Sequence, residues 1–161
     1  MNESRIIRAP LPRAVAGDWV TAADISGGNG VATGTTIVES AAMVVTIPAS
    51  PEGILFWLEV EFAQRRVSGG LWCGAWVKVP NWAPLVAGAD DTDAADFYTA
   101  RLINSTTDAV TRRVRINPDV MQSRSAASAL RIDAAVRAKG GQGDTVWAVT
   151  GIRSRLVYIP L

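Results

Sequence analysis

The sequence predicts an all-β protein, folded as an antiparallel sandwich of two sheets. Apolar side chains recur at every second position in at least five segments, which is the pattern of strands with one buried face. Connections that contain glycine separate these segments, and no segment carries an apolar stripe long enough for a packed helix. The 161 residues match a single domain, and 48% of them are apolar, which is enough for a sizeable core.

The two clearest strands cover residues 56–62 and 71–79. Cys73 belongs to the inward set of the second strand, where a free thiol acts as a small hydrophobic group. The glycine-ended connection 64–70 is typical of a β-hairpin, so these two strands are expected to pair with each other. Their outward side chains are then Trp57, Glu59, Glu61, Trp72, Trp76 and Lys78.

Six further segments are expected to be strands, and they cover residues 18–23, 41–47, 96–104, 110–116, 130–137 and 145–159. Gly151 is expected to bend or bulge the last of them, because a glycine inside a strand often marks such a site. A loop rich in Gly, Ser and Thr, residues 26–36, separates the first two segments.

The beginning of the chain is expected to be an extended N-terminal arm, residues 1–13, followed by one sandwich domain over residues 14–161. Pro10 and Pro12 favour extended backbone and remove two hydrogen-bond donors. Such an arm can become ordered against a neighbouring chain. Its expected contact residues are Arg5, Ile6, Ile7 and Arg8.

Composition excludes several classes of activity. The chain has no histidine, which removes Ser-His-Asp and Cys-His nucleophiles, His-ligated zinc and histidine-based pH switching. Cys73 is the one cysteine, so neither an intrachain disulfide nor an all-cysteine metal cluster can form. We therefore expect no enzymatic activity and no cofactor.

The net charge is +1, from 16 Lys+Arg against 15 Asp+Glu, so the chain as a whole has no polyelectrolyte character. No stretch reaches the roughly 18 consecutive apolar residues of a membrane span. The start of the chain lacks the apolar run of a signal peptide, and a single unpaired thiol fits a protein made in a reducing cytosol. We expect no membrane partner.

Charge is divided unevenly along the chain. Residues 1–96 hold six basic and eleven acidic residues, whereas residues 97–161 hold ten basic and four acidic residues. The two halves could pair within one sandwich, because sandwiches interleave distant strands. Alternatively, they could form a polarised surface that docks on a complementary neighbour.

Tryptophan is the most informative residue type, since the chain has six. Trp57, Trp72 and Trp76 share one outward register in the expected hairpin, and Trp82 follows closely. An internal cover or a protein interface would remove this apolar face from water. A third alternative is a sugar-stacking platform, in which Glu59 and Glu61 accept hydroxyl protons.

Two charged segments carry weaker signals. Asp90, Asp91, Asp93 and Asp96 offer the oxygen ligands that Ca²⁺ takes, but the segment lacks the glycine and the closing glutamate of an EF-hand loop. A solvated acidic loop is the preferred interpretation, with no metal. The run from Arg112 to Arg115 alternates between two strand faces, and the tryptophans lie in the acidic half, so no nucleic-acid partner is expected.

The list of strands and the closing run Thr145-Val146-Trp147-Ala148-Val149-Thr150-Gly151-Ile152-Arg153 carry a resemblance. Between about Asp18 and Tyr158, the chain resembles the jelly-roll β-sandwiches of small bacteriophage virion proteins and of carbohydrate-binding modules.

The resemblance to virion proteins implies a non-enzymatic structural protein of a virion that is assembled in the host cytoplasm. It would be a capsid decoration or cement protein, or a tail component. Its expected partners are other virion proteins and further copies of the chain. The alternative is a carbohydrate-binding module with a glycan as its partner.

Overall fold

A computed structural model describes residues 12–30, 33–49, 53–80, 96–117 and 130–160, apart from the side chains of residues 96, 97 and 130. These residues form twelve strands and no helix. The described part of the chain accordingly holds no helix that could cross a membrane.

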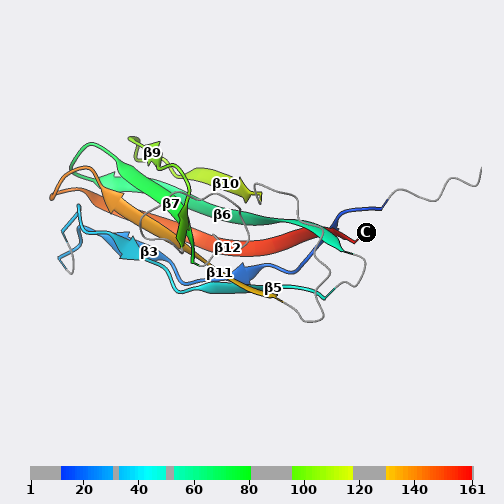
Figure 1. The fold of residues 1–161 in the computed structure, drawn as a ribbon. Helices are drawn as coiled ribbons and strands as arrows, with labels where there is room; N and C mark the ends of the chain where they lie inside the picture. The colour runs from blue at the N-terminus through cyan, green and yellow to red at the C-terminus, as the bar shows by residue number, and fades with distance from the viewer. Residues whose placement is uncertain (1–11, 31–32, 50–52, 81–95, 118–129, 161) are drawn as a thin grey trace, which may run out of the picture.

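The strands form two antiparallel sheets that lie as layers along the length of the molecule (Figure 1). Sheet 1 contains β1 (Val15–Ala16), β2 (Val20–Thr21), β3 (Ile25–Gly27), β6 (Ile54–Ser68), β10 (Val110–Ile116) and β12 (Val146–Pro160). Sheet 2 contains β4 (Val38–Glu39), β5 (Met43–Ile47), β7 (Cys73–Pro80), β8 (Asp96–Tyr98), β9 (Leu102–Asn104) and β11 (Leu130–Gly140).

The short strands continue one another along a shared neighbour, which leaves eight strand positions. β1, β2 and β3 all pair with β12, β4 and β5 pair with β11, and β8 and β9 pair with β7. Sheet 1 then has the order first, eighth, third, sixth, and sheet 2 has the order second, seventh, fourth, fifth. This is the strand order of a jelly roll, so the predicted antiparallel jelly-roll-like sandwich is confirmed.

The predicted hairpin between residues 56–62 and 71–79 is wrong. β6 pairs with β10 and β12 in sheet 1, whereas β7 pairs with β8, β9 and β11 in sheet 2. The connection between β6 and β7 crosses from one sheet to the other through Gly69 and Gly70, which have φ values of 61° and 49°. Local glycine signals are the same for a hairpin and for a crossing, and long-range pairing decides between them.

The core lies between the sheets and follows the predicted period of two. From Ile54 to Gln64, every second residue of β6 points inward and is buried, as are the alternate residues of β7, β11 and β5. The largest fully buried hydrophobic side chains are Trp147, Phe62, Met43, Ile47, Ile54, Leu58, Ile132 and Ile152.

A bulge in β12 changes which of its side chains face the core. Gly151 has a φ of 62°, and the register against β6 shifts between Thr150 and Arg153. Before the bulge, odd-numbered residues such as Val149 are buried, and after it, even-numbered residues such as Ile152 are buried. The bulge predicted at Gly151 is therefore confirmed, and it places Arg153 and Arg155 on the outer face of the sheet.

Trp147 closes one end of the core. Its side chain is 0% exposed, its Nε1–H donates a hydrogen bond to the Gly34 carbonyl at 3.0 Å, and its ring lies flat against Gly27. A Cβ atom at Gly27 would lie 2.6 Å from the indole. Glycine is therefore required at position 27 by contact with Trp147 rather than by backbone conformation.

Gly27→Ala should destabilise the protein by about 2 kcal/mol, because the added methyl group overpacks a rigid site. Gly143→Ala is the matched control, since no atom lies within 4 Å of a Cβ there, and it should stay within about 0.5 kcal/mol of the parent. Urea unfolding followed by tryptophan fluorescence measures both changes. Equal stabilities of the two variants would contradict the packing described for Trp147.

Cys73 lies inward on β7 and is 0% exposed, and burial raises the pKa of its thiol to about 12. We expect the folded protein to react with a thiol reagent at pH 8 about a hundredfold more slowly than the urea-unfolded chain, because the thiolate is the reactive form. Absorbance of the released chromophore measures the rate. Equally fast labelling of the folded protein would show that β7 is not packed as described.

Candidate functional site

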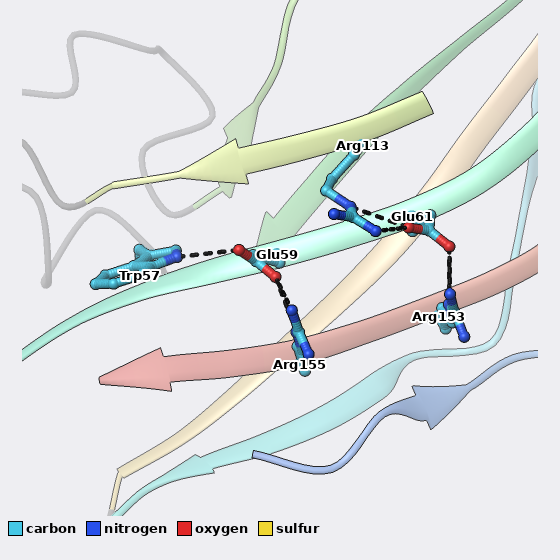
Figure 2. Close-up of polar contacts among 6 residues, drawn as sticks. All are labelled: Trp57, Glu59, Glu61, Arg113, Arg153 and Arg155. Atoms are coloured by element: carbon cyan, nitrogen blue, oxygen red, sulfur yellow. Dashed lines mark hydrogen bonds and ion pairs between the residues drawn. The ribbon is translucent and has the colours of Figure 1, made fainter. Parts of the chain in front are cut away.

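The outer face of sheet 1 gathers charged and aromatic side chains from three strands and one loop. We call this surface the arginine face, and it consists of Trp19, Trp57, Glu59, Glu61, Arg113, Arg115, Arg153 and Arg155. Figure 2 shows six of them: Glu61 lies between Arg113 of β10 and Arg153 of β12, and Glu59 lies between Trp57 of its own strand and Arg155 of β12.

Strand register explains why these side chains meet. Glu61 stands opposite Arg113 of β10 on one side and opposite Arg153 of β12 on the other. Glu59, two residues earlier on the same face, stands in the same way between Arg115 and Arg155. Opposite charges on directly paired residues stabilise a sheet. The Glu61 carboxylate lies between the guanidinium groups of Arg113 and Arg153, whereas the Glu59 carboxylate contacts that of Arg155.

Glu61 bridges two strands through its two oxygens. Arg113 donates to Oε2 through Nε at 3.0 Å and Nη2 at 2.6 Å, and Arg153 donates to Oε1 through Nε at 3.0 Å (Figure 2). The hydrogen bonds from Arg113 and then Arg153 lower the pKa of Glu61 below its ordinary value. This carboxylate is therefore ionised and fixed in place.

Glu59 is held by one arginine and one indole. Arg155 Nε donates to Oε2 at 2.8 Å, and Trp57 Nε1–H donates to Oε1 at 3.4 Å. Burial raises the pKa of Glu59, but these hydrogen bonds and the charges of Arg155 and Arg113 outweigh burial and lower the pKa overall. Glu59 thus orients Trp57 as well as Arg155.

The indole rings of this face lie beneath guanidinium groups. Arg153 and Arg155 both stand over Trp19, each 4.4 Å from the ring centre, and Arg115 stands 4.1 Å from the centre of Trp57. These separations are those of cation–π contacts. Trp19 and Trp57 therefore hold three of the four arginines of this face, and those three arginines cover the two rings.

The arginine face carries more positive than negative charge. Its four arginines outnumber its two glutamates, which leaves a surplus of two positive charges. Arg115 donates through Nε to the Asn117 Oδ1 at 2.8 Å, and among the described residues its two Nη nitrogens have no hydrogen-bond partner. Arg115 is thus the guanidinium group best placed to accept a new anionic partner.

A shallow depression of about 380 Å³ lies beside Glu61 and Arg153. Ala63, whose side chain is a methyl group, and Gly151, which has no side chain, leave room for it. The hydroxyl groups around it come from Thr21, Thr111 and Thr150.

The expected tryptophan platform does not exist as one surface. Trp57 lies on the outer face of sheet 1, whereas Trp72 and Trp76 lie on the outer face of sheet 2, because β6 and β7 are in different sheets. Arg101 stands over both of the latter, 5.7 Å from the ring centre of Trp72 and 5.0 Å from that of Trp76. Trp76 is 7% exposed, so internal cover accounts for this residue.

Several expected site residues lie outside the described part of the chain. They are Arg5, Ile6, Ile7 and Arg8 of the arm, Trp82, and Asp90, Asp91 and Asp93. Asp96 begins β8, but its side chain is not among those described. Within the described residues, no three His, Cys, Asp or Glu side chains gather as a metal site would require.

The uneven charge of the two halves is resolved by pairing inside the sandwich. Glu59 and Glu61, from the acidic half, bind arginines of β10 and β12, from the basic half. On sheet 2, Glu39 pairs with Arg137 in the same way. The fold therefore mixes the halves, and the alternative of a surface polarised by sequence half is wrong for these groups.

Sequence reasoning placed Arg113 and Arg115 on one strand face without finding that Arg113 pairs with Glu61, and it missed Arg153, Arg155 and Trp19. Arg153 and Arg155 are also separated by one residue, so this pair could have been read as one-sided charge on a strand. That β10 and β12 flank the same strand could not be read from their sequences. Trp19 lies in a connection, where no periodicity marks it.

No family model matches the sequence. No curated protein matches it either.

Solved structures provide distant likenesses in overall architecture. A chain of the T13 particle of infectious bursal disease virus is 12% identical with a TM-score of 0.45, and covers 92% of this chain and 31% of its own length. The VP2 subviral particle of that virus is 13% identical with a TM-score of 0.41, over 94% of this chain and 33% of that one. This chain therefore spans about a third of the viral chains.

A candidate sugar-binding protein of Bacteroides thetaiotaomicron is 11% identical with a TM-score of 0.32, and 88% of each chain is covered. At these values the fold assignment rests on the strand order described above, and neither likeness assigns a function.

Arg113→Met and Arg153→Met should each raise the pKa of Glu61 toward its ordinary value of 4.5. Carbon-13 NMR titration of the Glu61 carboxylate measures this change. Arg131→Met is the control, because Arg131 pairs with Asp133 on sheet 2 and its loss should leave Glu61 unchanged. If neither Arg113→Met nor Arg153→Met changed the pKa of Glu61, the bridge from Arg113 through Glu61 to Arg153 would be contradicted.

The same bridge predicts the sign of one pH effect on stability. Because folding lowers the pKa of Glu61, its contribution is complete above about 4.5 and is lost as the pH falls through the lowered value. The parent protein should therefore lose more stability below pH 4.5 than Glu61→Gln does. Urea midpoints at pH 6 and pH 3 compare the two proteins, and equal losses would contradict this linkage.

Proposed function

We propose that this chain is a non-enzymatic structural protein of a virion, which acts through protein–protein interfaces. In finer terms, it is a bacteriophage capsid decoration or cement protein, or a tail component. The observation that carries the proposal is the arginine face, where four arginines and two tryptophans are held in fixed positions.

Arginine and tryptophan are the residue types that dominate the energetics of protein interfaces. On the arginine face their side chains are already ordered by Glu59, Glu61 and one another, so binding a partner would cost little further side-chain entropy. The face is also broad, since it extends over β10, β6 and β12. A preordered, broad and charged surface favours recognition of another protein.

The ionisable groups of this chain support a non-enzymatic role. Glu59 and Glu61 are hydrogen-bonded to arginines and have lowered pKa values, which suits them poorly to general acid–base catalysis near neutral pH. The Cys73 thiol is buried, and its raised pKa of about 12 keeps it protonated. These groups build the fold and its surface instead.

The virion context comes from the jelly-roll strand order together with the resemblance of the sequence to small phage virion proteins. Jelly rolls occur in viral capsid proteins and in lectins, and a fold by itself does not fix a function. The arginine face favours the first of these two uses, because the rings of Trp19 and Trp57 are stacked by arginines rather than open to a sugar.

One observation favours the alternative, a carbohydrate-binding module. Trp72 is half-buried on sheet 2 and packs on Gly74 and Gly141, where a Cβ atom would come within 2.9 Å and 2.7 Å of its ring. Next to it, Leu71 is 60% exposed. This small apolar patch could stack against a sugar, although Arg101 covers part of it.

A deletion variant and a substitution variant distinguish the two candidate functions. Under the assembly proposal, removal of residues 1–13 should abolish incorporation into particles while the sandwich stays folded. Light scattering after size exclusion, and co-sedimentation with particles, measure association, and circular dichroism checks the fold. Under the glycan alternative, Trp72→Ala should abolish retention in affinity electrophoresis, and the deletion should have no effect. Retention on glycans by a chain that never associates would refute the assembly proposal.

A further inference from the structure

The proposed structural role leaves open which surface the arginine face binds. Building on that role, we propose that it binds the acidic segment Asp90–Asp96 of a second copy of this chain. The contact would be head-to-tail, with the face of one copy on the segment of the next. The proposal depends on two facts: the positive charge of the arginine face, and the position in sheet 2 of the two residues between which the acidic segment lies, Pro80 and Asp96.

The first fact is that the face cannot pair with itself. With a surplus of two positive charges, two arginine faces brought together by a twofold axis would repel each other. The partner surface must be acidic. Glu59 and Glu61 already fix the arginines, so the additional negative charge has to come from outside this face.

The hydrogen-bond donors that the arginines leave unused also favour an acidic partner. Arg113 and Arg153 reach Glu61 through Nε and Nη2, and a guanidinium has five N–H donors, so each keeps donors for a second acceptor. Arg115 has both Nη nitrogens unpartnered among the described residues. Beside them, Thr21, Thr111 and Thr150 present hydroxyl groups around the depression at Gly151. Carboxylates are acceptors for both kinds of donor.

The second fact is that the chain contains a matching acidic segment. Asp90, Asp91, Asp93 and Asp96 place four carboxylates within seven residues. The described residues that flank this part of the chain, Pro80 and Asp96, pair with each other in sheet 2.

The two sheets are separate layers (Figure 1). The hydrophobic core lies between them, and the arginine face lies on the outer side of sheet 1. The segment is thus tethered to the opposite layer of the sandwich. That arrangement suits a contact between copies, in which each molecule offers the face on one layer and the segment from the other. A contact of this kind repeats from copy to copy and builds a ring or a chain.

Charge substitutions in the full-length protein test this contact. Arg115→Glu removes the open guanidinium, and the triple variant Asp90→Asn, Asp91→Asn, Asp93→Asn removes most of the segment's charge. Each should weaken self-association about tenfold, measured by sedimentation velocity at low salt, and the parent's association should weaken between about 0.05 M and 0.5 M NaCl. Arg131→Ser, a solvent-exposed arginine of sheet 2, is the control and should associate like the parent.

Mixing the two variants gives the sharpest result. Each variant keeps one intact half of the contact, so the mixture should form heterodimers and grow no further. Circular dichroism confirms that each variant is folded, and Arg115→Ser replaces Arg115→Glu if the latter is not. An absence of heterodimers would overturn the proposal, as would an intramolecular contact, seen as a monomeric parent whose charge variants only change its stability.

A synthetic peptide of residues 88–96 provides an independent measurement with the full-length protein. The peptide should bind the parent and bind Arg115→Glu about tenfold more weakly, measured by fluorescence anisotropy. Failure of the peptide to bind would overturn the proposal. So would a short single-stranded oligonucleotide that binds the face more tightly than the peptide, since the face would then recognise phosphate.

These outcomes remain separate from the proposed function. If the parent associates or joins particles, but neither Arg115→Glu nor the triple Asp→Asn variant changes that association, the structural role stands and this contact is wrong. If the parent neither associates nor joins particles, the structural role itself fails. The peptide measurement then still decides whether the face recognises the acidic segment.

Discussion

The bulge at Gly151 is the constraint on which both faces of sheet 1 depend. β12 must bury Trp147 and Val149 near one end and Ile152 and Leu156 near the other, and these two sets have opposite parity. A regular strand could not bury both, because its side chains alternate strictly. One extra residue at a positive φ resolves the conflict, and the same shift brings Arg153 opposite Glu61. The core and the arginine face are thus aligned by one local irregularity.

Both outer faces use arginine in the same way, although they share no residues. On sheet 1, arginines join carboxylates to indole rings, and on sheet 2, Arg137 contacts Glu39 and also stands 5.3 Å from the ring centre of Tyr98. Aromatic side chains at such positions would otherwise expose apolar area to water. A guanidinium covers the ring while keeping its charge at the surface. At these positions the surface of the sandwich is therefore charged, although aromatic rings lie beneath it.

The sequence predicted the class of fold well because period-two alternation reports burial directly. Residues 56–62 show this: their alternation predicted the buried set of β6, and every member is buried. Alternation could not predict which strands pair with one another. Whether Gly69 and Gly70 reverse the chain within a sheet or carry it to the other sheet depends on contacts with Asp144 and Thr145, which are more than seventy residues away. Because strand pairing was not predictable, the sequence could not show that Trp57 and Trp72 lie on different sheets. It could not show either that arginines flank Glu61.

β10 forms one edge of sheet 1, where it pairs with β6 and with no other strand in the described part of the chain. Three of its seven residues are arginines, at positions 112, 113 and 115. Like charges along an open edge oppose its annealing to the edge of another sheet. Copies crowded at high local concentration would thus be steered away from irreversible strand exchange. Copies would then associate through contacts between side chains, which are reversible, so that a wrongly placed copy can dissociate and bind again.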